Sequence, residues 1–527
     1  MTVTLDGESF TVADTVAVAR REVLVEIADA ARERVRAARR RVEDVTAAGD
    51  PVYGLNTGFG ELVDTRIPPD RVRDLQRNLL RSHAAGGGDE LPRELVRATM
   101  VTRINALLSG YSGVREAVVD HLAAMLNAGV HPVVPARGSL GASGDLAPLA
   151  HLSLVLLGEG EADVDVAGGV ERRDGAAALE AAGIAPLELR EKEGLALING
   201  TQVTLGAAAL AVHDAERLCR AADAAGALTT EVTMGTTAAC DPAIQDVRPH
   251  AGQATSAATV RALAGDSEVV ASPRNCDRVQ DAYSIRCLPQ VHGAVRDAVA
   301  HLRTAVAVEL NSATDNPLVF PRADVDDRAS GTDAAGVISG GNFHGEPLAL
   351  RLDYLVAALT ELAAVSERRV DRILNPNLQE PHLPPFLADD VGVESGLMIA
   401  QYAAAARLNE CRAVGRAVTD NIPVSGGQED HVSMSATVAL DARRVLSAAR
   451  SVVAAELLAG AEAAGYLDED LSLGTGSAAV RDAVREVVPP LDGDRRLDGD
   501  LAAVETLVAE GLLDEAVADA VGGWPTR

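Results

Sequence analysis

Three of the smallest side chains, Ala142, Ser143 and Gly144, stand in a row just before Asp145, within the segment RGSLGASGDLAPLAH at 137–151. A serine between small residues first suggests the G-x-S-x-G turn on which many hydrolases expose their nucleophile. The aspartate occupies the place of the second outer glycine in that motif. A simple serine hydrolase is therefore disfavoured, and the segment needs another chemical explanation.

These three residues can build an electrophile if the fold bends their loop tightly. The amide nitrogen of Gly144 would then reach the carbonyl carbon of Ala142 and close a five-membered ring, because glycine has no Cβ to block the approach. Loss of one water from the ring and a second from the Ser143 side chain would leave a methylidene group conjugated to an imidazolone. The same three residues also suit an ordinary loop, so the rest of the chain must decide.

Seven further motifs follow one another along the chain: YGLNTGFG (53–60), SHAAG (82–86), GLALINGTQ (194–202), QDAYSIRCLPQ (280–290), NSATDNPLVF (311–320), SGGNFHGEP (339–347) and GGQEDHVSM (426–434). Together with the segment at 137–151, they resemble the aromatic amino acid ammonia-lyase family over nearly the whole sequence. The resemblance implies that Ala142, Ser143 and Gly144 cyclise autocatalytically into 4-methylidene-imidazol-5-one, or MIO. No metal and no diffusible cofactor is then expected, because this electrophile bonds the substrate amine and makes it a better leaving group.

The resemblance also assigns roles in deamination. Tyr53 corresponds to the base that removes the β-proton, for which a phenol of ordinary pKa about 10 needs a lowered pKa or a strongly preorganised site. Arg286 corresponds to the partner of the substrate carboxylate, which a planar guanidinium grips with two hydrogen bonds. Loop packing for the tyrosine and a surface ion pair for the arginine are the alternatives.

Four further residues complete the implied site around the electrophile and the substrate ring. Gln280 and Tyr283 correspond to residues that line and polarise the electrophile, and Asn199 to an amide that hydrogen-bonds both the electrophile and the substrate. Phe343 corresponds to an aromatic residue stacked near the substrate ring or the electrophile. A buried core aromatic is the competing interpretation of that phenylalanine.

Substrate choice depends on His83 and Glu429. An imidazole and a carboxylate match a heterocycle with two nitrogens, and a site built to bond those nitrogens rejects phenylalanine. Within the family the chain is most similar to the members that act on histidine, which implies deamination of L-histidine to trans-urocanate and ammonium, the first step of histidine degradation. The alternatives within the family are tyrosine or phenylalanine ammonia-lyases and aminomutases. Glu429 discriminates best between these substrates. Tyrosine lyases also carry histidine at the position of His83, whereas aromatic-specific relatives tend to carry glutamine at the position of Glu429.

The composition predicts a mainly α-helical fold. Hydrophobic residues make up 47% of the 527 residues but aromatic ones only 2%, which suits closely packed helices. Helical spacing of apolar residues extends over long segments at 203–226, 287–312, 345–374, 391–419 and 435–464. A helix of about 25 residues is roughly 40 Å long, so we expect a bundle of long helices, shared between subunits.

The predicted parts of the chain are an N-terminal mixed α/β region that carries the MIO loop (1–202), a central long-helix bundle (203–480) and a C-terminal helical appendix (481–527). The resemblance adds an aspartase/fumarase-like fold and a homotetramer in which each active site draws loops from three chains. Locally, we expect a hairpin at 2–12 around Asp6-Gly7, and a helical run from the N-cap Asp14 to Gly49. We also expect a helix from Gly113, capped by Ser112, to Gly129, and an acidic surface loop at 321–336.

The net charge of −29, with 48 basic residues against 77 acidic ones, disfavours a nucleic-acid-binding protein, which needs a basic footprint. All basic residues except Lys192 are arginine. An evenly spread acidic excess is typical of a surface adapted to concentrated salt. The sequence shows no secretion signal and no run of about 18 apolar residues, so we expect a cytoplasmic protein without a membrane span.

Two other classes of protein are weighed. A zinc hydrolase is disfavoured because H-E-x-x-H is absent, and QEDH and FHGE place their candidate ligands in loops without helical ligand spacing. The five cysteines are widely spaced without a C-x-x-C pair, which favours reduced thiols over disulfides or a zinc ribbon. An inactive helical scaffold would be expected to have lost some of the five residues that carry the chemistry, but all are present: Tyr53, Ser143, Asn199, Arg286 and Glu429.

Overall fold

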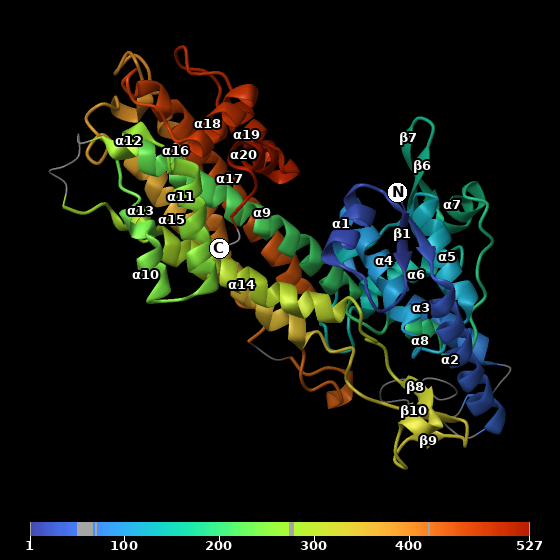
Figure 1. The fold of residues 1–527 in the computed structure, drawn as a ribbon. Coiled ribbons are helices and arrows are strands. Elements are labelled where there is room, and N and C mark those ends of the chain that lie inside the picture. Colours follow the sequence, from blue (N-terminus) through green and yellow to red (C-terminus); the bar gives the residue numbers. More distant parts are fainter. Residues whose placement is uncertain (1, 50–66, 69–70, 273–278, 420–421, 526–527) are drawn as a thin grey trace. The chain divides into compact units, whose positions relative to one another are not determined.

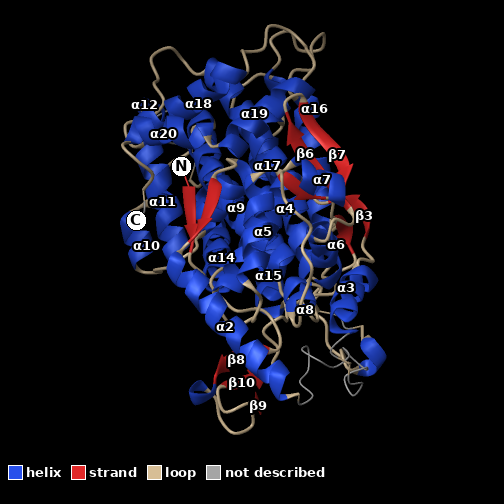
Figure 2. Ribbon diagram, turned by 90° about the vertical axis from the view of Figure 1, so that its right-hand side faces the viewer, coloured by secondary structure: helices blue, strands red, loops and turns tan. Residues whose placement is uncertain are grey.

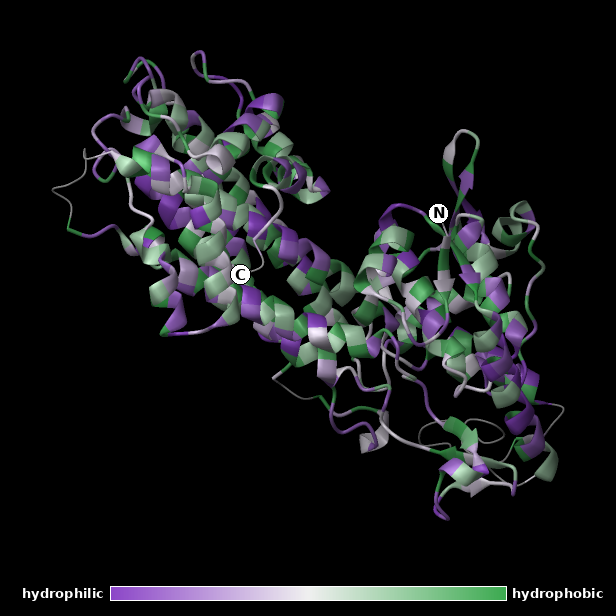
Figure 3. Ribbon diagram, in the orientation of Figure 1, coloured by the Kyte–Doolittle hydropathy of each residue, from purple (hydrophilic) through white to green (hydrophobic). Residues whose placement is uncertain are grey.

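The structure is a computed structural model, and it describes residues 2–49, 67–68, 71–272, 279–419 and 422–525. Helices make up most of the described chain, and the strands form only pairs and triplets (Figure 2). The predicted mainly helical fold class is thereby confirmed. Hydrophobic and hydrophilic residues alternate along the helices (Figure 3), as expected of elements that bury one face. Among the described residues, no helix combines the length and apolarity needed to cross a membrane.

The chain divides into two compact units. The first unit comprises Met1–His213, Leu302–Asp353 and Arg416–Leu440, and the second comprises Asp214–His301, Tyr354–Gly415 and Asp441–Arg527. The sequence predicts a different division, into three parts. The boundaries of those parts at 202 and 480 remain a prediction.

Short helices and small sheets form the N-terminal part of the first unit (Figure 1). The helices are α1 (Val12–Arg20), α2 (Asp29–Ala48), α3 (Val72–His83), α4 (Arg93–Leu108), α5 (Glu116–Asn127), α6 (Leu146–Leu156), α7 (Gly175–Ala181) and α8 (Glu193–Ile198). One antiparallel pair joins β3 (Gly87–Glu90) to β5 (Pro135–Arg137), and one antiparallel triplet has the order β4 (Val130–Pro132), β6 (Glu161–Val166), β7 (Gly169–Asp174). The predicted mixed α/β region is confirmed.

The N-terminal hairpin expected at 2–12 is wrong. β1 (Thr2–Leu5) pairs in parallel with β2 (Leu24–Ile27), and α1 forms the connection between them. The N-cap of α1 is Thr11, which forms a capping box with Asp14: the Thr11 hydroxyl accepts from the Asp14 amide at 3.1 Å, and the Asp14 carboxylate accepts from the Thr11 amide at 3.1 Å. Asp14 is therefore the N3 partner of the box rather than the N-cap. The predicted helical run is two helices separated by β2.

Two local expectations need smaller corrections. The helix predicted from Gly113 is α5, whose N-cap is Arg115 rather than Ser112. The segment 321–336 is not entirely a loop, because it contains a short 3-10 turn, β9 (Ser330–Gly331) and the start of β10 (Ala335–Ile338). β10 lies between β8 (Leu318–Pro321) and β9. Its buried side chains, with one from β8, join a cluster with two residues of α2: Val42, Val45, Val319, Ala335 and Val337.

The long helices predicted from apolar periodicity are present as α9 (Gln202–Val232), α14 (Leu288–Glu309), α15 (Glu346–Leu374), α16 (Met398–Arg412) and α17 (Ser435–Ala463). The prediction at 391–419 was too long at both ends. Turns precede α16, and Gly396 among them has a φ of +55°, outside helical geometry. The remaining helices of the second unit are α10 (Pro242–Asp246), α11 (Ala251–Ala264), α12 (Glu268–Ala271), α13 (Tyr283–Arg286), α18 (Thr475–Val487), α19 (Asp498–Glu510) and α20 (Leu512–Val521).

Inside the second unit, a fully buried ion pair joins α15 to α17, and a hydrogen bond connects α9 to the same pair. The guanidinium of Arg369 on α15 donates to both carboxylate oxygens of Glu456 on α17, at 2.5 and 2.9 Å, and both side chains have no exposed surface. Thr229 of α9 and Ser366 of α15 donate to the same carboxylate at 2.8 and 2.6 Å. The carboxylate is therefore fully satisfied, and removing it leaves the buried cation of Arg369 without its anionic partner.

We predict that Glu456→Ala destabilises the protein by about 3 to 5 kcal/mol, the usual cost of breaking a buried pair from one side. The measurement is the midpoint of denaturant unfolding in molar potassium chloride, because salt screens a buried pair little. Glu361→Ala removes an exposed acid from α15 and serves as the control, with a midpoint close to that of the parent. A Glu456→Ala midpoint equal to that of this control would contradict the prediction.

His131 on β4 generates a prediction about pH. Its ring is 3% exposed, and Arg97 donates to its Nε2 atom at 2.8 Å. Burial, reinforced by the charges of Arg93 and Arg97, lowers the pKa of His131 to about 4. The unfolded chain takes up this proton near pH 6.5 and the folded chain only near pH 4, so the stability contributed by neutral His131 is lost as pH falls through this window.

The expected loss between pH 7 and pH 4.5 is about 2 to 3 kcal/mol of unfolding free energy. His131→Leu removes this contribution and flattens the pH dependence by that amount, whereas His250→Ala, at an exposed position, leaves it unchanged. Denaturant unfolding at several pH values provides the measurement. Equal pH slopes for the parent and His131→Leu would show that His131 takes up its proton at the same pH in the folded and unfolded chain.

Candidate active site

The first unit contains a cavity of about 1200 Å³. Its lining comes from the end of α3, the loop between β5 and α6, the end of α8, and the loops that precede α15 and α17. Five residues predicted as site residues are among those that line it: His83, Ser143, Asn199, Phe343 and Glu429. Ala142 lines it as well and is 4% exposed. The structure therefore brings together predicted residues from sequence positions as distant as 83 and 429.

The backbone at Gly144 leaves no room for a side chain. Gly144 has a φ of +77° and forms a parallel bridge with Gly200. A Cβ at this position would lie 2.2 Å from the carbonyl oxygen of Gly200, far inside any allowed contact. The amide of the next residue, Asp145, donates to that same oxygen at 2.7 Å. Glycine is thus required by the packing of this loop as well as by the ring closure proposed for it.

Asn199 joins the two sides of this contact. Its side chain is 4% exposed, and its Nδ2 atom donates to the carbonyl oxygen of Ser143 at 2.8 Å. Behind it, the guanidinium of Arg103 on α4 donates to the carbonyl oxygens of Asn199, at 3.0 Å, and Ala196, and to Oε1 of Gln202 at 2.6 Å. Burial lowers the pKa of Arg103 to about 10. This arginine was not identified from the sequence, where it is one of many arginines on a helix.

Asp145 anchors the loop from the opposite end. Its fully buried carboxylate accepts hydrogen bonds from Ser139 Oγ at 2.9 Å, and from the amide and hydroxyl of Thr204 at 2.9 and 3.2 Å. Burial raises the pKa of this carboxyl despite these bonds. Because Thr204 belongs to the first turn of α9, Asp145 satisfies one of the amides that a helix start leaves without a partner.

The starts of two other long helices hold the same loop. The amide of Gly345, just before α15, donates to the carbonyl oxygen of Gly141 at 3.0 Å. Before α17, Ser433 Oγ donates to that oxygen at 3.0 Å, and the amide of Met434 donates to Leu140 O at 2.8 Å. The loop that carries Ala142, Ser143 and Gly144 is therefore fixed by the first residues of α9, α15 and α17.

Three further predicted residues belong to the other compact unit of the chain. Gln280, Tyr283 and Arg286 belong to the second unit, where they contact one another: the Arg286 guanidinium lies 4.6 Å from the Tyr283 ring centroid and donates to Gln280 Oε1. Tyr283 is 70% exposed. Tyr53 lies outside the described residues. The roles of these four residues remain predictions.

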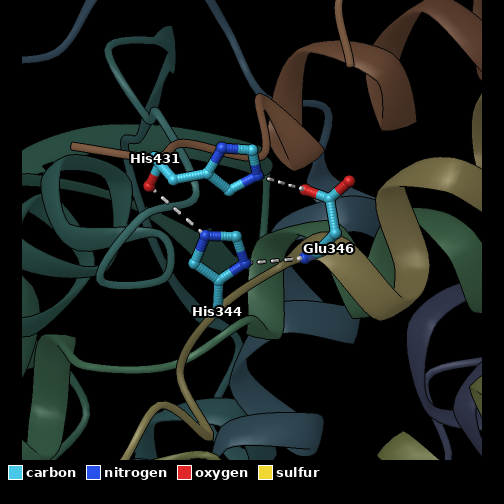
Figure 4. Close-up of side chains that lie close together, drawn as sticks. All are labelled: His344, Glu346 and His431. Atoms are coloured by element: carbon cyan, nitrogen blue, oxygen red, sulfur yellow. Dashed lines mark hydrogen bonds and ion pairs between the residues drawn. The ribbon is translucent and has the colours of Figure 1, made fainter. Parts of the chain in front are cut away.

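A second group of side chains, whose proximity the sequence did not indicate, also lines the cavity: His344, Glu346 and His431 (Figure 4). His431 Nε2 lies 3.9 Å from Glu346 Oε2, and the rings of His344 and His431 stack with centroids 5.7 Å apart. The motifs FHGE and QEDH contain them, but no local spacing indicates that they meet. Their proximity depends on the loops before α15 and α17 lying side by side.

The charge of the lining is one-sided. Three carboxylates, those of Glu346, Glu429 and Asp430, line the cavity, and no lysine or arginine is found among the described lining residues. Such a cavity favours positively charged ligands, including the ammonium group of an amino acid. The carboxylate of an amino acid would need a cation from outside the described lining.

Comparison with known proteins identifies the family of the chain. The family model for aromatic amino acid lyases matches residues 10–486. The chain is 62% identical over 519 residues to a probable histidine ammonia-lyase of Halobacterium salinarum, with 98% of each chain covered, and 49% identical over 519 residues to a histidine ammonia-lyase of Gloeobacter violaceus, again with 98% of each covered.

Solved structures show the same similarity. A histidine ammonia-lyase from Trypanosoma cruzi superposes with a TM-score of 0.89 at 38% identity, covering 99% of this chain and 96% of that one. A tyrosine aminomutase from Streptomyces globisporus superposes with a TM-score of 0.91 at 36% identity, covering 99% of each. The family match, the near-complete coverage and the shared fold together show that this chain belongs to the aromatic amino acid lyase family.

Proposed function

We propose that this chain is a carbon–nitrogen lyase that deaminates L-histidine to trans-urocanate and ammonium. The observation that carries the proposal is the loop at 142–144, which lines the cavity and has Gly144 packed against Gly200. The names of the relatives that are 62% and 49% identical support histidine as the substrate. The carboxylate-rich lining suits the cationic amine and imidazole of that amino acid.

The residues at 142–144 fit the MIO group that the family implies. Gly144 occupies a backbone conformation and a space that exclude a side chain, Ala142 is small and buried, and the Ser143 side chain lies at the cavity. MIO supplies an electrophile that activates the substrate amine as a leaving group. Asn199 holds the Ser143 carbonyl in place, and Arg103 in turn fixes the backbone of Asn199.

Recognition of the substrate ring is proposed for His83 and Glu429. The Nδ1 atom of His83 lies 2.9 Å from Leu79 O at the end of α3, so a neutral ring donates there and leaves Nε2 to accept a hydrogen bond. Glu429, whose backbone carbonyl accepts from the Val424 amide at 2.9 Å, offers a carboxylate to the ring N–H. An imidazole has one donor and one acceptor nitrogen, and this pair of residues matches both.

The remaining roles complete the proposal. Arg286 binds the substrate carboxylate, and Tyr53 accepts the β-proton, with Gln280 and Tyr283 near the electrophile. In a cytoplasmic homotetramer, other copies of the chain supply the residues that each cavity lacks, and the acidic surface keeps the assembly soluble in concentrated salt. The reaction itself uses no metal and no diffusible cofactor, because proton removal and amine activation are both assigned to the chain.

One prediction of the proposed function concerns the electrophile. In molar potassium chloride, L-histidine should give a rise in near-ultraviolet absorbance as urocanate forms, and L-tyrosine and L-phenylalanine should give none. Ser143→Ala removes the hydroxyl that must be eliminated and should lower kcat by at least about 1000-fold, roughly 4 kcal/mol of transition-state stabilisation. Ser330→Ala, at an exposed serine of β9, is the matched control and should keep full activity. An active Ser143→Ala enzyme would rule out the self-made electrophile.

Another prediction of the proposed function concerns Glu429. Glu429→Gln keeps the shape of the side chain but loses a charge-assisted hydrogen bond, so kcat/KM for L-histidine should fall about 10- to 100-fold. The inhibition constant of L-phenylalanine, whose ring offers no N–H, should change little. Steady-state kinetics of the parent and of Glu429→Gln, with L-histidine as substrate and L-phenylalanine as inhibitor, tests this. Equal effects on the two amino acids would mean that Glu429 does not read the substrate ring.

A further inference from the structure

The cavity also contains a group of side chains that the proposed lyase chemistry does not use. His344 and Glu346 lie at the start of α15, and His431 lies in the loop before α17. One possible ligand atom from each residue lies within 4.8 Å of those of the other two. All three residues belong to the first unit and line its cavity, and Figure 4 shows their side chains close together.

These side chains lie close together but do not satisfy one another's hydrogen-bonding groups. Oε2 of Glu346 is buried and has no hydrogen-bond partner among the described residues, and His431 Nε2 faces it at 3.9 Å, too far for a hydrogen bond. The two contacts of the His344 ring are long: 3.3 Å from the Glu346 amide to Nδ1, and 3.4 Å from Nε2 to His431 O. A buried carboxylate oxygen without a partner is costly in native proteins, and a bound ion is one common reason for it.

The surrounding charge favours a cation at this point. Glu429 and Asp430 add two carboxylates to the same lining, which holds no lysine or arginine among the described residues. The ring planes of His344 and His431 are only 9° apart, and the imidazole of His431 is largely exposed. The three candidate ligand atoms lie within 4.8 Å of one another, so a rotation of the exposed His431 ring is needed to bring them around one ion.

We propose that His344, Glu346 and His431 form a binding site for a divalent transition metal. Two imidazoles and one carboxylate are donors typical of Zn²⁺ and Co²⁺, whereas Mg²⁺ and Ca²⁺ prefer oxygen ligands alone. Three protein ligands leave a coordination position open to a water or another small molecule in the cavity. The site is a binding function of its own and does not depend on the proposed deamination.

The test is a titration of the metal-stripped full chain with Co²⁺, followed by the visible absorption that cobalt acquires when bound to nitrogen ligands. Molar potassium chloride suppresses loose binding to the many surface carboxylates. We expect one tightly bound Co²⁺ per chain, displaced by Zn²⁺. His431→Ala and the near-isosteric Glu346→Gln should each weaken binding at least about 10-fold, or by 1.4 kcal/mol or more. His250→Ala, at an exposed histidine of the second unit, should bind as the parent does.

Ser143→Ala separates this proposal from the proposed function. It should bind Co²⁺ with parental affinity whether or not it deaminates histidine, because Ser143 is not one of the three ligands. Circular dichroism of each variant shows whether the helical fold is retained, and Glu346→Gln preserves side-chain volume if His431→Ala does not fold. Absence of a stoichiometric Co²⁺ spectrum in the parent, or equal affinity in folded Glu346→Gln, would overturn the metal site.

Discussion

The position of the loop at 138–145 depends on three helix starts. Asp145 accepts from the first turn of α9, and the backbone of Gly141 and Leu140 is held by residues just before α15 and α17. The first turn of a helix has amides without intrahelical partners, so it is a natural place for such contacts. The bend, which glycines of positive φ at 138, 141 and 144 permit, is thereby held in place by elements more than 50 residues away. The contact between Gly144 and Gly200 is possible only within this arrangement.

Charge is divided between the lining and the layer beneath it. Carboxylates line the cavity, whereas two basic side chains behind the lining are buried and donate hydrogen bonds to neighbouring oxygen atoms. Arg103 is fully buried against backbone carbonyls, and Lys192, also fully buried, donates to Asp315 at 2.6 Å. Lys192 is the only lysine of the chain, and its compact ammonium occupies a space in which burial lowers its pKa. The buried cations stabilise the backbone around the site without neutralising the cavity that faces the ligand.

Apolar periodicity was sufficient to locate the long helices, because a buried stripe constrains many consecutive residues. It was insufficient for β1, whose parallel partner β2 begins 19 residues after β1 ends, and for β10, whose pairing depends on β8 and on burial against α2. The motifs identified His83, Ser143, Asn199, Phe343 and Glu429, which line one cavity. They did not indicate Arg103, or the proximity of His344, Glu346 and His431, because these contacts arise only when distant elements pack.

The bend at residues 142–144 depends on the same contacts. Ring closure requires the amide nitrogen of Gly144 to approach the Ala142 carbonyl, and in an isolated loop of small residues that bend costs conformational entropy at every position. In the folded chain this cost is offset by hydrogen bonds that join Leu140, Gly141, Ser143 and Asp145 to residues 199–204, 345 and 433–434. These partners are present only after the starts of α9, α15 and α17 have come together. The geometry of this loop is therefore a product of tertiary structure, and a mutation that loosens any of these helix starts also displaces the loop.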